Sequence, residues 1–500
     1  MLAIVANLLE SSRRPMPGHS VQHHLNQCLR SGIVTEDDLW LWLRAQAELR
    51  RLHRASFDAA RRKAAELTEA GLWAASVGAD DSSSGKESTC PRIVFGRGRE
   101  SMEDQAVAWF NSGKSRSVQP GALWLRALRL TLEEIKALSG TFVASRGTLT
   151  YDLVSAFAMA TSSPLLWFMP DGLSSELPSD EHVQWKTRHH FVTALSCHLG
   201  RNRCPKAVRW TCRDRMVAHL ADVHIVLELR PSSRLARILV DQYRQSPRAI
   251  WVLKGIREDD SPRPGNRELV ERLPVQPRFF HVGGPPSEGP RRAPPACLSG
   301  AAVCEEWTPS WKDYLYHYTR ACNGPWPGED HQRYCIGILK GDPFSSHSPL
   351  ATLARILNER RIRASHLLVR GKQSVVSLTS RPPQELHLFR RWNRSQARWT
   401  LEPYGIALRK PILKRMGARP TIYGGESVYP RLGPKDRYRF QSRGGRASWM
   451  AEREWRLNGD LWLWELAPAD YFVFVPNGDE ALQLADLAEL PVRCVTLDRA

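Results

Sequence analysis

Residues 216–255 read MVAHLADVHIVLELRPSSRLARILVDQYRQSPRAIWVLKG, and this stretch decides the fold class of the middle of the chain. Residues 224–229 (HIVLEL) and 249–253 (AIWVL) are short apolar runs, which is typical of buried strands. Residues 233–243 lie between them and have the apolar spacing of an amphipathic helix. A strand, a helix and a second strand in this order predict a βαβ unit with parallel strands.

The same alternation continues towards the N-terminus. Residues 141–144 and 165–169 read as strands, and residues 123–138 and 151–160 read as helices. We therefore predict a Rossmann-like α/β domain with a mostly parallel sheet over residues 91–282. Sheets of this kind bind ligands beyond the carboxyl ends of their strands.

Two turns at such strand ends form the candidate nucleotide site. One follows the strand at 141–144 and the other follows the strand at 224–229, and each leads into a helix. A small turn there presents backbone N–H groups and the positive end of the helix dipole to an anion. Serine at a helix start is also a common N-cap, so an ordinary cap is the alternative interpretation. The candidate residues are Ser145, Arg146, Gly147, Thr148, Ser232 and Ser233.

Residues 212–255, which begin CRDRMVAHLAD and end AIWVLKG, resemble the SLOG superfamily, the Rossmann-like group that includes DprA and the Lonely Guy phosphoribohydrolases. The resemblance covers residues 123–255 and implies nucleotide or nucleic-acid sensing. The paired-glycine and PGG-x-G-T-x-x-E motifs of the enzyme members are replaced here by the turn Arg-Pro-Ser-Ser at 230–233. The sequence also has neither G-x-G-x-x-G nor G-x-x-x-x-G-K-[ST].

The last 190 or so residues have a different pattern, roughly one domain in size. Short aromatic runs at 314–318, 374–378, 404–408 and 461–466 are separated by turns, and residues 348–358 read as a helix. This pattern predicts an α+β domain with a largely antiparallel sheet over residues 311–500.

The segment 452–456 (EREWR) is the candidate catalytic strand. Residues i and i+2 of a strand face the same side, so Glu452, Glu454 and Arg456 should share one face. Two neighbouring carboxylates raise each other's pKa unless a cation intervenes. Such a carboxylate can stabilise the oxocarbenium-like ribose that forms when a glycosidic bond breaks. A charged edge strand with cross-strand pairs is the alternative.

Four motifs in order, HYT at 317–319, VVSLTS at 375–380, EPYGIAL with GARPTIYGG at 402–425, and EREWR, resemble the AbiGi-like abortive-infection family. Its domains are similar to the ADP-ribosyltransferase fold, and the resemblance covers residues 314–481. It implies that NAD is the substrate and that His317 and Glu454 meet across one cleft. The implied roles are ribose binding by His317, orientation of the carboxylate by Ser377 and Thr379, catalysis by Glu454 with Glu452 beside the acceptor, and cofactor contacts by Tyr318, Tyr404 and Tyr423.

The 500 residues carry a formal net charge of +19. This surplus attracts nucleic acid, nucleotides or acidic partners, or it is merely solvated arginine. Residues 431–456 are basic with interleaved aromatic side chains, which suits single-stranded nucleic acid. A solvated loop beside an aromatic core strand is the alternative.

The remaining features set boundaries. Residues 1–90 read as helices with a connector at 78–85, and residues 283–310 form a Pro/Gly-rich linker. The ten cysteines include no C-x-x-C pair, so we expect reduced thiols and no metal. Residues 1–9 do not resemble a signal peptide, and no apolar run is long enough to cross a membrane. We expect a cytoplasmic protein.

The functional hypothesis joins the two resemblances. We expect a nucleotide-sensing stress or phage-defence protein whose C-terminal domain transfers ADP-ribose from NAD to a macromolecular acceptor or hydrolyses NAD. The alternative is a non-catalytic nucleic-acid-binding or antitoxin-like protein that uses its basic surface.

Overall fold

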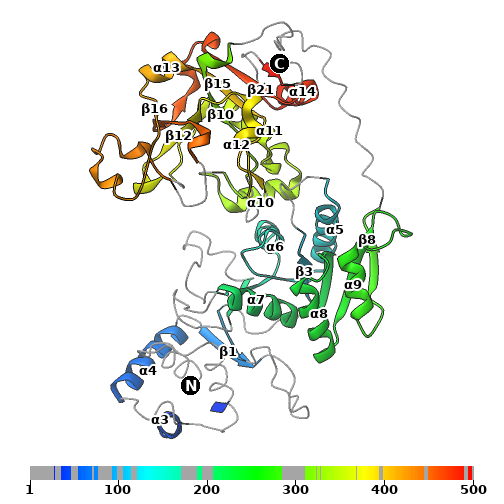
Figure 1. The fold of residues 1–500 in the computed structure, drawn as a ribbon. Helices are drawn as coiled ribbons and strands as arrows, with labels where there is room; N and C mark the ends of the chain where they lie inside the picture. Colours follow the sequence, from blue (N-terminus) through cyan, green and yellow to red (C-terminus); the bar gives the residue numbers. More distant parts are fainter. Residues whose placement is uncertain are drawn as a thin grey trace. The chain divides into compact units, whose positions relative to one another are not determined.

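The computed structural model describes two units, each with its own sheet (Figure 1). Unit 1 comprises residues 1–113 and 121–287, and unit 2 comprises residues 114–120 and 288–500. The described residues are 27–28, 35–46, 54–69, 72–76, 93–97, 105–113, 121–170, 189–193, 206–283, 310–322, 324–326, 328–366, 369–393, 398–443, 449–488 and 494–497.

Unit 1 is built on a nine-stranded sheet of order β1-β2-β6-β5-β4-β3-β7-β8-β9. The pairs from β6 to β9 are parallel, and the pairs β1–β2 and β2–β6 are antiparallel. The predicted mostly parallel α/β domain is therefore confirmed. The strands are β1 (Leu72–Ser76), β2 (Ile93–Arg97), β3 (Ala106–Asn111), β4 (Thr141–Ala144), β5 (Leu165–Phe168), β6 (His189–Thr193), β7 (Val223–Glu228), β8 (Ala249–Gly255) and β9 (Arg278–His281).

Helices pack on both faces of this sheet. On one face, Trp109 of β3 donates its indole N–H to Thr131 of α5 over 2.8 Å, and Phe142 of β4 contacts Phe157 of α6. On the other face, Phe110 belongs to the core that α7, α8 and α9 complete. The helices are α5 (Leu123–Ala137), α6 (Leu149–Ala160), α7 (Lys206–Leu220), α8 (Arg234–Gln245) and α9 (Pro264–Arg272).

The chain reverses its direction of growth at β3. After β3 it adds β4, β5 and β6 on one side, and later β7, β8 and β9 on the other. In sheets wound in this way, the crevice for ligands opens at the carboxyl ends of the two strands that flank the reversal. For this chain those strands are β3 and β7.

The N-terminal region differs from the purely helical expectation. It contains α3 (Glu36–Ala45) and α4 (Arg54–Glu69), but the run LWAAS forms β1 and extends the sheet through β2. A five-residue apolar run is too short to show a helical or strand period. The connector expected at 78–85 lies outside the described residues, as does the linker at 283–310 except for its two end residues.

Unit 2 contains a seven-stranded sheet of order β16-β19-β12-β10-β15-β21-β22. Only the pair β21–β22 is parallel among its described pairs, so the largely antiparallel prediction is confirmed. The strands are β10 (Tyr314–Tyr318), β12 (Val375–Thr379), β15 (Gly405–Arg409), β16 (Arg419–Pro420), β19 (Glu454–Asn458), β21 (Tyr471–Val475) and β22 (Cys494–Thr496).

The two faces of this sheet have separate cores. Leu315, Val376 and Leu378 pack with α11 and α14 on one face, whereas Tyr316, Phe472 and Phe474 pack with α12 on the other. The helices are α10 (His331–Lys340), α11 (Pro349–Glu359), α12 (Leu386–Phe389), α13 (Lys410–Arg415) and α14 (Gly478–Leu487). Short strand pairs complete the unit, namely β11 (Arg361–Ile362) with β20 (Leu461–Trp462), β13 (Trp392–Asn393) with β14 (Arg398–Trp399), and β17 (Ile422–Gly424) with β18 (Phe440–Ser442).

One predicted strand of unit 2 is mostly a turn. Residues 461–466 were expected to be extended, but only Leu461–Trp462 pairs as β20, and Leu463–Glu465 forms a 3-10 turn. The aromatic residues of this run supported a strand by propensity, which tertiary context overrides for short segments.

Candidate functional sites

The carboxyl edge of the unit 1 sheet brings the predicted turns together. Parallel strands end at one edge, so the turns after β4 and β7 flank the end of β3. The β3 and β7 turns are bonded directly, because the N–H of Arg230 donates to Ser112 Oγ over 2.9 Å. The N–H of Ser112 donates back to the carbonyl of Glu228, also over 2.9 Å. This edge is the candidate site of unit 1.

The turn after β4 is held mainly by its own side chains. Ser145 is fully buried and donates its hydroxyl to the carbonyl of Phe168 over 2.7 Å. Thr148 is the N-cap of α6 and accepts the N–H of Tyr151. Gly147 has φ +85°, and its N–H donates to the Asp152 carboxylate over 3.2 Å. A carboxylate of the chain thus already occupies the amide that a phosphate would use.

Helix α7 covers this turn. A Cβ atom on Gly147 would lie 2.2 Å from the Trp210 ring, so only glycine fits beneath it. Arg213 donates to the carbonyl of Arg146 over 3.0 Å and forms a buried ion pair with Asp214 at 2.7 Å. Burial raises the pKa of Asp214, and the Arg213 guanidinium opposes that rise. The cluster fixes the backbone around Arg146.

The turns after β7 and β8 repeat this pattern. Ser233 is the N-cap of α8 and is nearly buried, and Ser232 has φ +54°. The N–H of Ser232 donates to Glu268 over 2.6 Å, and Asp260 accepts the N–H groups of Ile256 and Arg257 at 2.6 and 2.9 Å. Those two backbone bonds hold the pKa of Asp260 below its usual value. In all three turns, a carboxylate of the chain occupies backbone amides.

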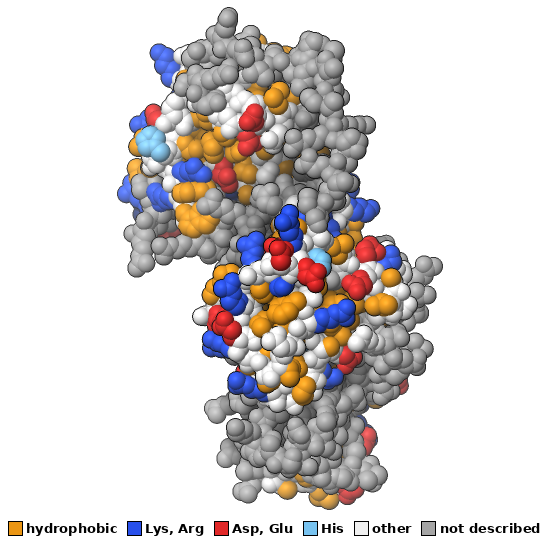
Figure 2. All heavy atoms as spheres, turned by 90° about the vertical axis from the view of Figure 1, so that its right-hand side faces the viewer, with side chains coloured by type: hydrophobic (Ala, Val, Ile, Leu, Met, Phe, Trp, Pro, Cys, Tyr) orange, Lys and Arg blue, Asp and Glu red, His pale blue; other side chains and the backbone are white. Residues whose placement is uncertain are grey.

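Arginine side chains surround the same edge, and we call them the carboxyl-edge arginines. Arg230, Arg234, Arg257 and Arg263 are exposed, and Arg146 is half-buried. Figure 2 looks at the side of unit 1 that carries β8 and α9, and it shows Lys and Arg side chains standing among Asp and Glu with hydrophobic side chains between them. The amides of Gly147, Ser232, Ile256 and Arg257 already bind carboxylates of the chain, so the positive groups that we consider at this edge are the arginine side chains.

In unit 2, His317 and Glu454 lie on opposite faces of the sheet. Tyr316 pairs with Thr379, and Thr379 pairs with Glu454, so these three side chains share a face. His317 follows Tyr316 along β10 and therefore points to the other face. His317 and Glu454 therefore do not meet on one ribose as expected. The strand register aligns Glu454, through Thr379, with Tyr316 rather than with His317.

His317 has a local partner instead. Its Nδ1 lies 3.0 Å from the carbonyl oxygen of Ser377 on the neighbouring strand, and burial lowers its pKa. Among the described residues, β10 and β12 pair at one position only, Tyr316 with Thr379. The imidazole thus contacts a carbonyl of β12, that of Ser377, beyond the paired position. The Ser377 side chain is exposed.

Glu454 is clamped by Arg456, which is two residues away on the same face as the sequence predicts. The Arg456 guanidinium donates to both carboxylate oxygens, at 2.9 and 3.2 Å, and it is nearly fully buried. It also donates to the carbonyls of Tyr438 and Phe440 and to Gln441 Oε1, at 3.0, 2.7 and 2.6 Å. The carboxylate of Glu454 is therefore held in one orientation by a bidentate charge-assisted pair.

Glu452 lies near Glu454 but not on the strand, contrary to the expected shared strand face. Residues Trp449–Glu452 form a 3-10 turn, Arg453 has φ +47°, and β19 begins at Glu454. Burial, followed by the charge of Glu454, raises the pKa of Glu452 to about 7, and Arg391 and Arg320 oppose that rise. The hydroxyl of Thr379 donates to the backbone carbonyl of Glu452 rather than to a carboxylate.

Only one of the three predicted cofactor tyrosines contacts the glutamates. Tyr423 accepts the backbone N–H of Glu454 at 3.3 Å, and burial and the charge of Glu454 raise its pKa to about 12. Tyr318 is buried in the core and donates to the carbonyl of Arg381 over 3.0 Å. Tyr404 donates to Glu480 over 3.0 Å. Sequence reasoning missed Arg320 and Arg391, which no short-range spacing connects to Glu452.

Neither a metal site nor a membrane helix emerges from the described part of the chain. No three His, Cys, Asp or Glu side chains gather there in a way that could hold a metal ion. Among those same residues, no helix is both long and apolar enough to span a bilayer.

Comparison with known proteins leaves the family open. No family model matches the chain, and no curated protein matches it. Among solved structures, DNA processing protein A from Helicobacter pylori, described for its single-stranded DNA binding mode, is 14% identical with a TM-score of 0.29, covering 42% of this chain and 92% of its own. DNA processing protein A from Streptococcus pneumoniae is 15% identical with a TM-score of 0.34, covering 57% of this chain and 95% of its own.

A third similar structure is the molybdenum cofactor binding protein from Rippkaea orientalis. It is 9% identical with a TM-score of 0.23, covering 36% of this chain and 90% of that chain. At TM-scores of this size, the likeness assigns no function to the chain.

Proposed function

We propose that unit 1 binds nucleic acid at the carboxyl edge of its sheet. The observation that carries the proposal is that backbone amides and arginine side chains have different partners at this edge. Backbone amides of three turns bind the carboxylates of Asp152, Glu268 and Asp260, whereas arginine side chains surround the ends of β4, β7 and β8.

Occupied turn amides together with surrounding arginine side chains favour a polymer over a mononucleotide as the ligand. Tight sites for the pyrophosphate of a nucleotide use free backbone N–H groups at helix N-termini. Nucleic-acid backbones are bound largely by arginine and lysine side chains, with many phosphates each contributing a little. The chain's net charge of +19 supports long-range attraction of such a polymer.

The experiment is a salt titration of oligonucleotide binding. Fluorescence anisotropy would follow full-length protein and a labelled single-stranded DNA over a range of salt concentrations. Replacing Arg230 and Arg234 by glutamine should weaken binding and reduce the salt slope by roughly 0.7 per lost phosphate contact. The matched control is Arg248→Gln, because Arg248 precedes β8 at the opposite edge of the same sheet and pairs with Asp222.

Three further arms decide the ligand class. Duplex DNA, single-stranded RNA and a mononucleotide would compete with the labelled strand. Competition by the mononucleotide at the same concentration of phosphate groups would contradict the polymer preference. An unchanged slope in the Arg230/Arg234 variant would remove this edge as the binding surface.

We propose, as a second function, that unit 2 cleaves a glycosidic bond with Glu452 and Glu454. The favouring observation is that their environments differ. The Arg456 guanidinium donates to both carboxylate oxygens of Glu454, whereas burial raises the pKa of Glu452 to about 7. An ionised carboxylate can stabilise an oxocarbenium-like sugar, while a group that titrates near neutrality can move a proton to or from the acceptor.

NAD is the substrate to test, with ADP-ribose transfer to a macromolecule or hydrolysis as the outcome. Glu454→Gln should abolish NAD loss, whereas His317→Ala should leave it unchanged because His317 faces the other side of the sheet. Loss of turnover in both variants would restore the His317 hypothesis. No turnover by the wild-type protein would leave nucleic-acid binding as the sole function. A role in phage defence stays a prediction, to be tested by phage challenge of cells that express the protein.

A further inference from the structure

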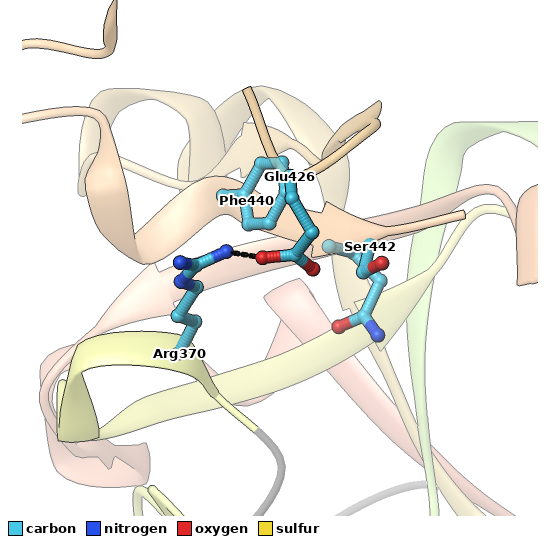
Figure 3. A pocket seen from close by; sticks show the side chains of 5 residues that line it. Arg370, Glu426, Phe440 and Ser442 are labelled. Carbon is cyan, nitrogen blue, oxygen red and sulfur yellow. Dashed lines mark hydrogen bonds and ion pairs between the residues drawn. The ribbon is translucent and has the colours of Figure 1, made fainter. Parts of the chain in front are cut away.

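Unit 2 contains a polar pocket of about 180 Å³ outside the carboxylate pair. Arg370, Glu426, Phe440, Gln441 and Ser442 line it, and Figure 3 shows the Arg370 and Glu426 side chains directed at each other across it. Whole small-molecule sites usually have roughly 300 Å³ or more. The pocket therefore fits one charged group of a ligand rather than a complete nucleotide.

Arg370 is held in place independently of its ion pair. Its guanidinium lies 4.5 Å from the centre of the Tyr429 ring and 5.9 Å from that of Phe440. The next residue, Gly371, has φ +78°, and a Cβ atom there would lie 2.3 Å from the Tyr429 hydroxyl. The tyrosine thus contacts both the side chain of Arg370 and the turn that carries it. The planar donor group would stay in position if Glu426 left.

Glu426 is a weak partner for this arginine. Its side chain is 69% exposed, and that of Arg370 is 43% exposed. Ion pairs as exposed as this one add little stability because solvent screens them. A carboxylate on a guanidinium occupies the position that another oxyanion would take. The pair therefore marks an oxyanion position that the chain fills with its own side chain.

The other walls offer hydrogen-bond donors. Gln441 Oε1 already accepts from Arg456 over 2.6 Å, so the amide NH2 is the group that Gln441 has left to donate. Ser442 adds a hydroxyl, and the fully buried Phe440 closes the apolar side. A guanidinium, an amide NH2 and a hydroxyl together suit a tetrahedral oxyanion with several acceptor oxygens.

We propose that this pocket binds a phosphate group, with Arg370 as its main donor and Glu426 as an internal competitor. The site is distinct from the carboxyl-edge arginines of unit 1. The ligand is either free phosphate or a phosphate monoester, since both present the same group. A phosphate displaces the Glu426 carboxylate from Arg370 and takes over its hydrogen bond to the guanidinium.

The test is isothermal titration calorimetry on the full chain. The protein used carries Arg230→Gln and Arg234→Gln, so that phosphate bound by these two arginines of unit 1 does not contribute to the measured heat. The result is then independent of the nucleic-acid proposal. Inorganic phosphate and ribose 5-phosphate are the two probes, and tighter binding of one identifies the source. Arg370→Gln should weaken binding about tenfold or more, the range for a lost charge-assisted hydrogen bond. Glu426→Gln should tighten it about two- to fivefold, because the competitor is gone.

The matched control is Arg363→Gln, which breaks a partly exposed pair with Glu359 that is not among the residues lining the pocket. It should leave phosphate affinity unchanged. The opposite responses of Arg370→Gln and Glu426→Gln separate binding from folding, since a purely structural ion pair would give the same loss in both. Weaker or equal binding in Glu426→Gln, or equal binding in Arg370→Gln, would overturn the proposal.

Discussion

At the scale of single residues, two glutamates that are two positions apart have different chemistry. Glu454 lies on β19, and the buried Arg456 lies two residues further along on the same face of the strand. The Arg456 guanidinium donates to both carboxylate oxygens of Glu454. Glu452 lies before the strand, half-buried and close to the charge of Glu454. Burial and a like charge both disfavour ionisation, which explains the direction of its pKa.

Glu452→Gln should change the pH dependence of stability. The folded-state pKa of about 7 is above the ordinary 4.5, so the native state binds this proton more tightly than the unfolded state. The contribution of this bound proton to the free energy of unfolding is complete below about pH 4.5 and is lost as the pH rises through 7. The variant should therefore be more stable than the wild type at pH 8 by up to about 3 kcal/mol, with no such gain near pH 4. Urea unfolding at both pH values measures this.

Glu465→Gln, at an exposed position of a 3-10 turn, is the control and should show no such difference. Equal stability of Glu452→Gln and wild type at pH 8 would mean that folding does not raise the pKa of Glu452.

At the scale of elements, the start of α9 shows how one side chain joins a helix to two strands. Asn266 is fully buried, accepts the N–H of Leu229 over 2.9 Å, and donates to the carbonyls of Leu227 and Leu253, each over 3.0 Å. Gly265 precedes it, and a Cβ atom there would lie 2.1 Å from the carbonyl oxygen of Leu229. The ends of β7 and β8 are thus fixed beneath the candidate site.

Asn266→Ala should cost about 3 kcal/mol or more of unfolding free energy, because three buried backbone groups lose their partner. It should also weaken nucleic-acid binding, since the turn with Arg230 follows Leu229. Denaturant titration and anisotropy measure the two effects. The control is Asn358→Ala, which removes one exposed bond to the carbonyl of Leu487 and should cost under about 1 kcal/mol. A similar loss in both variants would contradict the role given to Asn266.

At the scale of the whole molecule, each unit has a core of its own. Met216, Phe110 and Leu239 belong to the core of unit 1, while Leu353 and Val473 belong to that of unit 2. Chains with several cores commonly depart from two-state unfolding. We expect scanning calorimetry to resolve two transitions. Asn266→Ala should lower one of them, and Glu452→Gln at pH 8 should raise the other. A single transition that both substitutions move would contradict this.

Local sequence pattern was sufficient to predict the strands and the helix within residues 216–255. The predicted strand at 224–229 is β7, the helix at 233–243 is α8, and the strand at 249–253 is β8, each within about two residues. Their apolar spacing is set by neighbours in the chain. The central strand β3 was not predicted, although AVAWFN is almost entirely buried, because an isolated apolar run does not indicate its partners.

Sequence pattern alone was sufficient for the parallel and antiparallel characters of the two sheets, the helix cap at Ser233, and the shared face of Glu454 and Arg456. All of these depend on residues a few positions apart. Only the tertiary structure decided that Tyr316 rather than His317 aligns with Glu454, and that carboxylates of the chain fill the amides at the carboxyl edge. Alternation along a strand is local, but the register between strands is set by packing of distant segments, and a shift of one residue moves a side chain to the other face.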